Sequence, residues 1–271
     1  MLRSPGAPPD ADGAFRSVGA VSTPPIEHDR SEAQRLENLL AAAVVLVLLL
    51  GAGIAGVVAV SRRGPDALPA YAQPAAAPVP ADAAARTTWA RDAAGPTGVP
   101  ERALVAYAGA EAAARGELAD CGLSWVTLAG LGRVESNHGR FGDTALDDAG
   151  RPVDPIRGPE LDGTNGNREI RDTDGGRLDG DTTYDRAVGP LQFIPTTWAQ
   201  YGADGDGDGV DDPDDLDDAA LAAARYLCAD DRDLRRGDDW RAAVLAYNRS
   251  QAYVDRVRRE AVGAATALDR P

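Results

Sequence analysis

The chain has 271 residues, which is enough for one domain with a sizeable core and some appended segments. Acidic residues outnumber basic ones by 43 to 28, the net charge is -15, and all of the Lys/Arg positions are arginine. This balance excludes the basic footprint that a nucleic-acid-binding protein requires. The acidic excess is concentrated between Asp143 and Asp239, where a solvated surface or a cation site explains it better than a partner does.

The first part of the chain divides by composition into three segments. Residues 1–38 are polar and rich in Pro, Gly and Ala, which predicts a disordered terminus. Residues 39–60 form an uncharged apolar run that is long enough to span a membrane as a helix. A buried core helix is the alternative, but charges flank the run, and a cleaved signal peptide would have an apolar region of only about 7–15 residues. We therefore predict an uncleaved membrane anchor, followed over 61–98 by an extended, disordered Ala/Pro linker.

From residue 99 to residue 265 the pattern predicts a single, mainly α-helical domain, because strand-like alternation is nearly absent. Pro100 suits the first position of a helix over 101–114, and Ser124 can cap a helix over 125–135. Four further helices, each opening on a good capping or polar residue, are predicted over 196–201, 218–228, 238–247 and 250–262.

A long polar segment over 139–183, rich in Asp, Gly and Arg, predicts loops with at most a short hairpin. A loop of this length inside a domain is usually functional or mobile. The three tryptophans that fall within predicted helices have the spacing of core residues rather than of sugar-binding platforms; these are Trp125, Trp198 and Trp240.

The helix that ends at Glu135 carries the first candidate for chemistry. Trp125, Leu128, Leu131 and Val134 recur at three-residue steps, so one side of this helix is apolar. Glu135 follows Leu131 by one turn, which places its carboxyl group at the edge of a core. Burial raises the pKa of a carboxyl group, and a raised pKa makes glutamate a usable general acid near neutral pH. On this stretch alone, a helix-terminal glutamate before a turn is the alternative.

Two cysteines, Cys121 and Cys228, each adjoin a predicted helix. An even pair outside the membrane favours a disulfide, and two buried free thiols are the alternative.

Residues 204–210 match the opening of an EF-hand calcium loop, with the sequence DGDGDGV. Carboxylates at alternate positions converge on one hard cation, and the backbone carbonyl at the seventh position can be a further ligand of that cation. The twelfth position is Asp215 rather than the usual bidentate glutamate, and Asp218 is the other candidate. An acidic surface turn is the alternative. The pattern predicts a structural Ca²⁺ site whose first ligands are Asp204, Asp206, Asp208 and Val210.

Three segments together resemble the lytic murein transglycosylases, in particular the membrane-bound-type B branch with a lysozyme-like domain. Residues 132–136 look like the catalytic-glutamate segment, with the sequence GRVES. Residues 187–195 are similar to the cleft-lining segment, with the sequence AVGPLQFIP, and residues 246–250 to the tyrosine-asparagine segment, with the sequence AYNRS. The branch also carries an EF-hand-like loop whose last acidic ligand lies beyond the twelfth position, which favours Asp218. The resemblance covers roughly residues 99–262.

The resemblance implies cleavage of peptidoglycan glycan strands by a single acid. Glu135 would protonate the glycosidic oxygen between N-acetylmuramic acid and N-acetylglucosamine, and the substrate's acetamido group would stabilise the sugar carbon. Glu135 would then activate the 6-hydroxyl of the same sugar, giving a 1,6-anhydro product. By the same carry-over, Gln192, Tyr247 and Asn248 would contact the substrate and Ser136 would orient Glu135.

The same resemblance leads us to place the domain outside the cytoplasm, on a single-pass anchor in the cell membrane, as a monomer. Arg62 and Arg63 directly after the apolar run conflict with this orientation under the positive-inside rule. Three alternatives to a lytic transglycosylase remain open: a hydrolytic muramidase on the same fold, a non-catalytic calcium-stabilised wall-binding module, and a calcium sensor.

Overall fold

The computed structural model describes residues 71–164 and 166–269. The predicted disordered terminus, the predicted membrane anchor over 39–60 and the first part of the predicted linker lie outside these residues. Among the helices of the described ranges, none combines the length and the apolar character that crossing a membrane requires.

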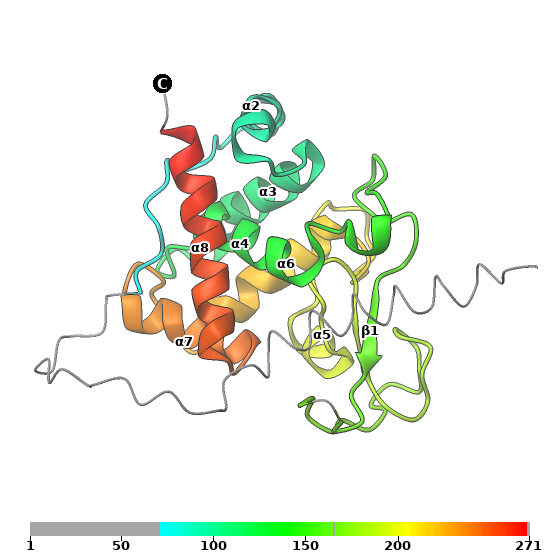
Figure 1. Cartoon of the computed structure of the whole chain (residues 1–271). Helices are drawn as coiled ribbons and strands as arrows, with labels where there is room; N and C mark the ends of the chain where they lie inside the picture. Colours follow the sequence, from blue (N-terminus) through cyan, green and yellow to red (C-terminus); the bar gives the residue numbers. More distant parts are fainter. Residues whose placement is uncertain (1–70, 165, 270–271) are drawn as a thin grey trace, which may run out of the picture. The chain divides into compact units, whose positions relative to one another are not determined.

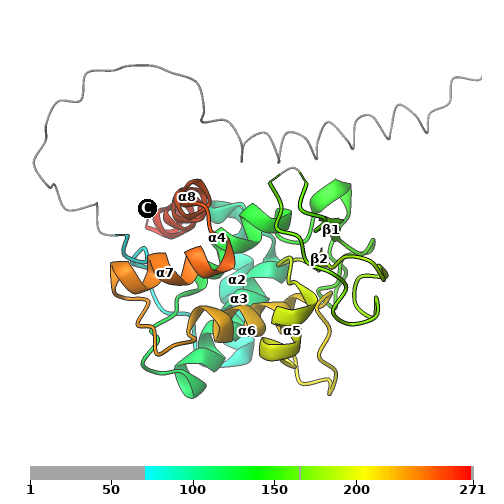
Figure 2. The same ribbon diagram turned by 90° about the horizontal axis from the view of Figure 1, so that it is seen from below.

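The described part of the chain is mainly α-helical, as predicted, with one two-stranded antiparallel sheet (Figure 1). The helices are α2 (Ala83–Thr97), α3 (Glu101–Glu117), α4 (Trp125–Ser136), α5 (Pro195–Tyr201), α6 (Leu216–Leu227), α7 (Gly237–Tyr247) and α8 (Gln251–Leu268), and the strands are β1 (Arg157–Glu160) and β2 (Arg186–Val188). In both views α7 and α8 lie on one side of the domain, and β1 with its neighbouring loops lies on the other (Figures 1 and 2).

Helix α4 lies in the hydrophobic core of the domain. Its first eight residues are all buried, and it packs against α8 on one side and α3 on another (Figure 2). Two glycines make these approaches possible. A Cβ atom at Gly130 would stand 2.6 Å from the carbonyl oxygen of Val257 in α8, and one at Gly132 would overlap the hydroxyl of Tyr107 in α3. The predicted core tryptophans are confirmed, because Trp125, Trp198 and Trp240 are all at most 2% exposed.

The amino end of α4 is capped by residues that are distant in sequence. Glu111 of α3, itself buried, accepts a hydrogen bond from the backbone N–H of Trp125 at 2.7 Å. Gln73 Oε1 accepts from the N–H of Ser124 and from the Thr127 hydroxyl, both at 2.9 Å. The prediction that the Ser124 side chain caps this helix is therefore wrong, since its hydroxyl makes no such bond. The tertiary structure supplies acceptors where the local sequence does not.

The predicted linker is folded over its second half. Helix α2 occupies residues 83–97 and packs on α3 and α8. It is capped by Asp82, whose side chain accepts from the N–H of Ala85. Trp89 of this helix lies edge-on against Trp125, with ring centroids 5.1 Å apart. The prolines before Asp82 and Pro96 itself indicated an extended linker. The alanine-rich stretch between them, however, has high helix propensity. The prediction of a disordered linker is wrong for these residues.

Residues 71–79 also belong to the domain, as an extended segment, here called the strap, that contacts α3, α8 and the start of α4. Besides the contacts of Gln73, the N–H of Val79 donates to Glu111 at 3.1 Å, and Val79 is buried. The hydroxyl of Tyr71 donates to Asp255 of α8 at 2.9 Å. The domain therefore begins at or before residue 71, not at residue 99.

The other predicted helices are present, with shifted starts. Helix α6 begins at Leu216, because Asp215 rather than Asp218 is its capping residue and accepts from the N–H of Asp217 at 2.8 Å. Helix α7 begins without a side-chain cap, whereas the hydroxyl of Ser250 caps α8, as predicted.

The polar segment over 139–183 is held by short-range hydrogen bonds. It contains a 3-10 turn (Phe141–Asp143), strand β1 and isolated bridges, and β1 pairs with β2 beyond it. Asp172 Oδ1 accepts from three consecutive backbone N–H groups, and such aspartate turns order the backbone without regular structure. The predicted disulfide is confirmed: Cys121 and Cys228 are bonded, with Cα atoms 5.5 Å apart, and join the loop before α4 to the end of α6.

Candidate active site

Glu135 lies in the last turn of α4, half-buried between α4 and the first turn of α8. The buried hydroxyl of Tyr253 donates a hydrogen bond to its Oε1 atom. Sequence reasoning predicted the glutamate at the edge of the core, which the structure confirms, but did not find this partner. Glu135 is therefore neither a solvated surface carboxylate nor a fully enclosed one.

The surroundings of Glu135 act on its pKa in opposite directions. Burial raises the pKa to about 7, while the hydrogen bond from Tyr253 and the positive charge of Arg256 lower it. Among the described residues no second carboxylate contributes to the shift. A carboxyl group with a pKa near neutrality is substantially populated in both protonation states, which is what a group that first gives and then takes a proton needs.

Tyr247, at the end of α7, connects Glu135 to the segment over 187–195. Its hydroxyl donates to the carbonyl oxygen of Leu191 at 2.8 Å. Burial first, and then the negative charge of Glu135, raise the pKa of Tyr247 well above its usual value, so the tyrosine lies in the field of that carboxylate. The structure thus brings together the three segments that were singled out in the sequence.

Gln192 occupies a tight turn in which the backbone has a left-handed conformation, with φ of 52°. Its Nε2 atom donates to the carbonyl oxygen of Gly189 at 2.9 Å, and the bridge between Val188 and Phe193 closes the turn. This conformation costs a non-glycine residue free energy, and such outliers concentrate at functional sites. Gln192 is half-buried, and its Oε1 atom lies beside Gly158 of β1, where an added Cβ would be 3.1 Å away.

Ser136 is placed differently from Gln192 and Tyr247. It is 1% exposed, donates to the carbonyl oxygen of Pro190 at 2.5 Å, and accepts from the N–H of Gly139 at 2.7 Å. These bonds join the end of α4 to the segment of Gln192. Ser136 therefore positions the two segments relative to each other. Among the described residues, its side chain forms no hydrogen bond with Glu135.

Asn248 follows Tyr247 and ends α7, with its backbone N–H bonded to the carbonyl oxygen of Val244 at 3.1 Å. Its half-buried side chain makes no hydrogen bond to any described residue, so its amide is available. His138, to which the sequence assigned no role, is buried and lies 3.1 Å through Nδ1 from the hydroxyl of Tyr107.

Tyr253 is the residue of this site that sequence reasoning missed. It shares a helix face with Val254, Val257 and Ala261, all of them fully buried, so its pattern is that of a core residue. The available signal was its position in the first turn after the Ser250 cap, close to the tyrosine-asparagine segment. Only the packing of α8 on α4 shows that its hydroxyl meets Glu135.

The acidic loop between α5 and α6 gathers three of the predicted metal ligands. Asp204, Asp206 and Asp218 each offer a carboxylate oxygen, and these atoms lie within 4.8 Å of one another. Asp218 is buried, and burial followed by the nearby carboxylates raises its pKa to about 6. Carboxylate oxygens in this arrangement have the chemistry of ligands for a hard cation such as Ca²⁺.

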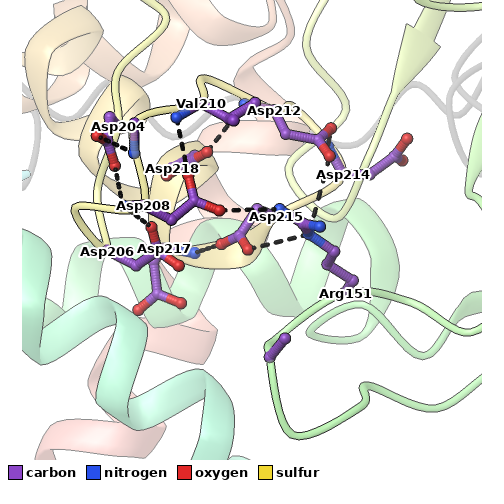
Figure 3. A network of polar contacts seen from close by, with 12 residues as sticks. Arg151, Asp204, Asp206, Asp208, Val210, Asp212, Asp214, Asp215, Asp217 and Asp218 are labelled. Carbon is purple, nitrogen blue, oxygen red and sulfur yellow. Dashed lines mark hydrogen bonds and ion pairs between the residues drawn. The ribbon is translucent and has the colours of Figure 1, made fainter.

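One predicted side-chain ligand, Asp208, lies outside that group (Figure 3). It forms an ion pair with Arg151 at 3.6 Å. The prediction for Val210 concerns its backbone carbonyl, which is not a side-chain ligand of this group. Asp215, the twelfth position of the loop, also pairs with Arg151, at 3.2 Å, in addition to capping α6. Of the two candidates for the last acidic position, the carboxylate of Asp218 is the one that joins Asp204 and Asp206.

The acidic loop also touches the segment of Gln192. A Cβ atom at Gly189, where φ is 75°, would overlap the carbonyl oxygen of Pro213. Arg157 of β1 binds Asp214 through two hydrogen bonds of 2.7 and 2.8 Å. The position of the Gln192 turn therefore depends on the conformation of the loop that carries the three carboxylates.

Residues 171–263 match the family model described as the transglycosylase SLT domain. The match supports a lytic transglycosylase-type domain. The matched range includes Gln192, the acidic loop, Tyr247 and Tyr253, while Glu135 precedes it. The match confirms the resemblance to a lytic transglycosylase over two of the three segments, residues 187–195 and 246–250, and supports a peptidoglycan-cleaving enzyme. The segment over 132–136 lies outside the matched range. No curated protein and no solved structure matches the chain.

Proposed function

We propose that the protein is a lytic transglycosylase that cleaves the β-1,4 bond between N-acetylmuramic acid and N-acetylglucosamine and leaves a 1,6-anhydro end. The observation that carries the proposal is the setting of Glu135. It is a half-buried carboxyl group with a pKa of about 7, hydrogen-bonded by Tyr253 and close to Tyr247 and the Gln192 turn.

In the first step protonated Glu135 gives its proton to the glycosidic oxygen as the bond from that oxygen to C1 of the muramic acid breaks. Tyr253 then stabilises the carboxylate through its hydrogen bond, and Arg256 through its charge. The substrate's own acetamido group neutralises the positive charge at C1. Since no carboxylate among the described residues contributes to the pKa shift of Glu135, we assign this role to the substrate rather than to a second acid.

In the second step the Glu135 carboxylate takes the proton of the 6-hydroxyl while O6 bonds to C1. This returns Glu135 to its protonated state, so the cycle closes without water. Gln192 and Asn248 supply amide groups for the acetamido group and the ring, and the half-buried positions of both side chains support contact with a substrate.

Product analysis tests this function directly. Purified sacculi digested by the wild type should release anhydro-muropeptides, which mass spectrometry identifies as lighter by one water than hydrolysis products. The Glu135→Gln variant should lose activity by about 10²–10⁴-fold, the usual contribution of a general acid–base group. Hydrated products would contradict the proposal and indicate a hydrolytic muramidase instead. Unchanged digestion by the variant would leave a wall-binding module or a calcium sensor as the better description.

We infer that Ca²⁺ binds at Asp204, Asp206 and Asp218, with a structural role. The support is the convergence of their oxygens within 4.8 Å and the burial of Asp218, an acid that a divalent cation would neutralise. Removing Ca²⁺ with a chelator should lower the melting temperature of the wild type and leave that of Asp218→Asn unchanged. A melting temperature of the wild type that is insensitive to both Ca²⁺ and chelator would refute the site.

We also infer an extracytoplasmic domain held by a membrane anchor over 39–60. The disulfide between Cys121 and Cys228 supports this topology, because such bonds persist in oxidising compartments. Protease added to intact cells lacking a wall should digest the domain and spare a tagged amino terminus. Protection of the domain until the cells are lysed would reverse the topology.

A further inference from the structure

Gln73 of the strap is bonded to the start of α4 through both polar atoms of its side chain. Its Oε1 atom accepts from the backbone N–H of Ser124 and from the hydroxyl of Thr127, both at 2.9 Å. Its Nε2 atom donates to the carbonyl oxygen of Gly122, also at 2.9 Å. All three partners belong to the loop before α4 or to its first turn, so one side chain fixes where this helix begins.

Thr127 extends these bonds to a third segment of the chain. Its hydroxyl oxygen accepts from the indole Nε1–H of Trp240 in α7 at 3.0 Å, and both residues are 0% exposed. The direction of each bond is fixed, because an indole N–H can only donate and the single hydroxyl proton is left for Gln73 Oε1. Gln73, Thr127 and Trp240 therefore form a continuous chain of hydrogen bonds from the strap through α4 to α7.

The two helices that this chain joins carry residues of the candidate active site at their other ends. Helix α4 runs from Thr127 to Glu135, and α7 runs from Trp240 to Tyr247, about two turns in each case. Among the described residues, the bond between Thr127 and Trp240 is the only hydrogen bond between these two helices. Tyr247 in turn lies in the field of Glu135. One end of the helix pair is thus fixed by the hydrogen-bonded chain, and the other end holds the site.

The packing of α4 on α8 makes Glu135 sensitive to the position of α4. Gly130 lies so close to α8 that an added Cβ would stand 2.6 Å from the carbonyl oxygen of Val257. The charged or titratable groups that act on Glu135 or lie in its field come from the two helices around it: Arg256 and Tyr253 from α8, and Tyr247 from α7. A displacement of α4 therefore changes both the burial of Glu135 and its hydrogen bond from Tyr253.

We propose that Gln73 is a positioning residue for the reaction. Through Thr127 it holds the starts of α4 and α7 together, and it thereby fixes Glu135 and Tyr247 at the other ends of these helices. The assignment rests on the proposed function, because it concerns the geometry of that site. Gln73 precedes the range that matches the family model and lies in the segment that the sequence predicts as a linker. The strap is therefore part of what positions the site rather than a spacer.

The Gln73→Met variant tests this role, because methionine keeps the length and the apolar stem of the side chain and removes the strong acceptor. Without that acceptor α4 loses its fixed start and the burial of Glu135 decreases. Burial is the largest effect on the pKa of Glu135, so this pKa should fall from about 7 toward its usual value of 4.5. The measurement is a nuclear magnetic resonance titration of the full-length chain labelled with ¹³C at the glutamate carboxyl groups, in which the Glu135 signal is assigned by its absence in Glu135→Gln.

Kinetics on soluble glycan strands provide a second readout. At pH 7 the kcat of Gln73→Met should fall about 10- to 100-fold, because a misplacement of about 1 Å can cost about 10²-fold in rate. KM should change much less, because the Gln192 turn closes on Gly189 and makes no hydrogen bond with the strap. Activity that requires protonated Glu135 should also decline at a lower pH than in the wild type.

Three further variants separate this role from a general loss of stability. Gln73→Glu keeps an oxygen that accepts from the start of α4, where its negative charge is favourable, so it should restore the wild-type titration and kcat. Thr127→Val breaks the chain at its middle with a side chain of similar shape, and it should lower the pKa of Glu135 as Gln73→Met does. Tyr71→Phe removes a different hydrogen bond of the strap, to α8, and should leave both readouts unchanged.

A Gln73→Met variant with a lower melting temperature but a wild-type titration and kcat would show that Gln73 is only structural, and the proposal would be wrong. If Gln73→Met does not fold, Thr127→Val decides by the same two measurements. The titration does not require activity, so it separates this proposal from the function on which it rests. A lowered pKa of Glu135 in Gln73→Met, together with hydrated products from the wild type, would contradict transglycosylation and still support the positioning role.

Discussion

The pKa of Glu135 results from three effects that do not cancel: burial, a hydrogen bond and a nearby positive charge. Burial against α8 disfavours the charged carboxylate and is the largest effect, while Tyr253 and Arg256 favour the charged form. The balance leaves a group that titrates near pH 7 rather than near its usual value of 4.5. Each of these effects belongs to a named contact, so each can be altered separately.

Replacing Tyr253 by phenylalanine should move the pH profile of activity upward. The tyrosine hydroxyl lowers the pKa of Glu135, so its removal raises that pKa further above 7. Activity that requires protonated Glu135 should then decline at a higher pH than in the wild type. The rate at the plateau should fall about 10- to 100-fold, because a hydrogen bond to a charged group contributes about 1.5–3 kcal/mol. The measurement is the rate of sacculus digestion from pH 5 to pH 9.

Tyr71→Phe is the control for this change. Its hydroxyl also donates to an acid of α8, Asp255, but Tyr71 does not contribute to the pKa shift of Glu135. This variant should keep the wild-type pH profile. If Tyr253→Phe gave a profile shifted to lower pH, the direction assigned to the hydrogen bond would be wrong.

Glu135→Gln should be more stable than the wild type at alkaline pH. The pKa of Glu135 is about 7 in the folded protein and about 4.5 when exposed, so the folded state retains the proton more strongly and loses stability as the pH rises between these values. A full shift corresponds to about 3 kcal/mol, and solvent contact of the half-buried side chain reduces this to roughly 1–2 kcal/mol. Urea unfolding should show this gain at pH 8 and none at pH 4.

Asp92→Asn, on the exposed face of α2, supplies the comparison because it removes an exposed carboxylate that forms no ion pair with any described residue. It should show no pH-dependent gain. Equal stability of Glu135→Gln and wild type at pH 8 would mean that the glutamate carries no burial cost, and its role as an acid near neutral pH would lose its physical basis.

The sequence predicted this site in part because spacing reports local structure well and tertiary contacts poorly. Glu135 was found from the apolar period of its own helix. Gln192 and Tyr247 were found from short segments that resemble a family. The partnership of Tyr253 with Glu135 joins residues 118 positions apart, and Ser136 turned inward to Pro190, 54 positions away. Neither contact leaves a periodic signal in the chain.

At the scale of elements, the position of α4 depends on how closely its neighbours approach. Gly130 admits the backbone of α8 and Gly132 admits the hydroxyl of Tyr107, so the helix is held on two sides by contacts that side chains would prevent. Its amino end is held by Gln73 and Glu111. These contacts explain why a helix with two glycines, which have low intrinsic helix propensity, forms the centre of the domain.

Gly132→Ala should destabilise the domain strongly. The added Cβ would overlap the buried hydroxyl of Tyr107, and overpacking of a core usually costs about 1–3 kcal/mol, occasionally more. Gly109→Ala in α3 is the matched control, because nothing lies within 4 Å of the added atom. It should stabilise the protein by about 0.5–1 kcal/mol through helix propensity. Urea midpoints of the two variants should move in opposite directions; a Gly132→Ala variant as stable as the wild type would contradict the packing described.

The strap over 71–79 and α2 shows where reasoning from composition fails. Proline and alanine were interpreted together as an extended linker, because neither carries a side chain that marks a core. In the structure Val79 is buried and Gln73 satisfies three polar groups around the start of α4. The information lies in the complementarity between the strap and the domain, which the local sequence does not contain.

At the scale of the whole molecule, the chain closes its domain with a covalent bond between distant segments. Cys121 and Cys228 are separated by 107 positions, and the loop between them includes α4, the polar segment over 139–183 and the acidic loop. The backbone carbonyl of Cys121 also accepts from the N–H of Leu234 at 2.7 Å. The bond therefore joins the loop before α4 to the end of α6, and the loop-rich side of the domain lies between them in sequence.

Removing this bond should destabilise the protein mainly by releasing the unfolded chain. Closing a loop of about 100 residues contributes about 4.7 kcal/mol in the chain-entropy model, so a double Cys121→Ser, Cys228→Ser variant should lose on the order of 4 kcal/mol in the free energy of unfolding. The wild type treated with a reductant should lose the same amount, while the reductant should not affect the variant further. Because Glu135 and Tyr253 contact each other independently of the bond, digestion of sacculi well below the melting temperature should be retained. A variant with an unchanged urea midpoint would show that hydrogen bonds such as that of Leu234 hold the junction without the disulfide.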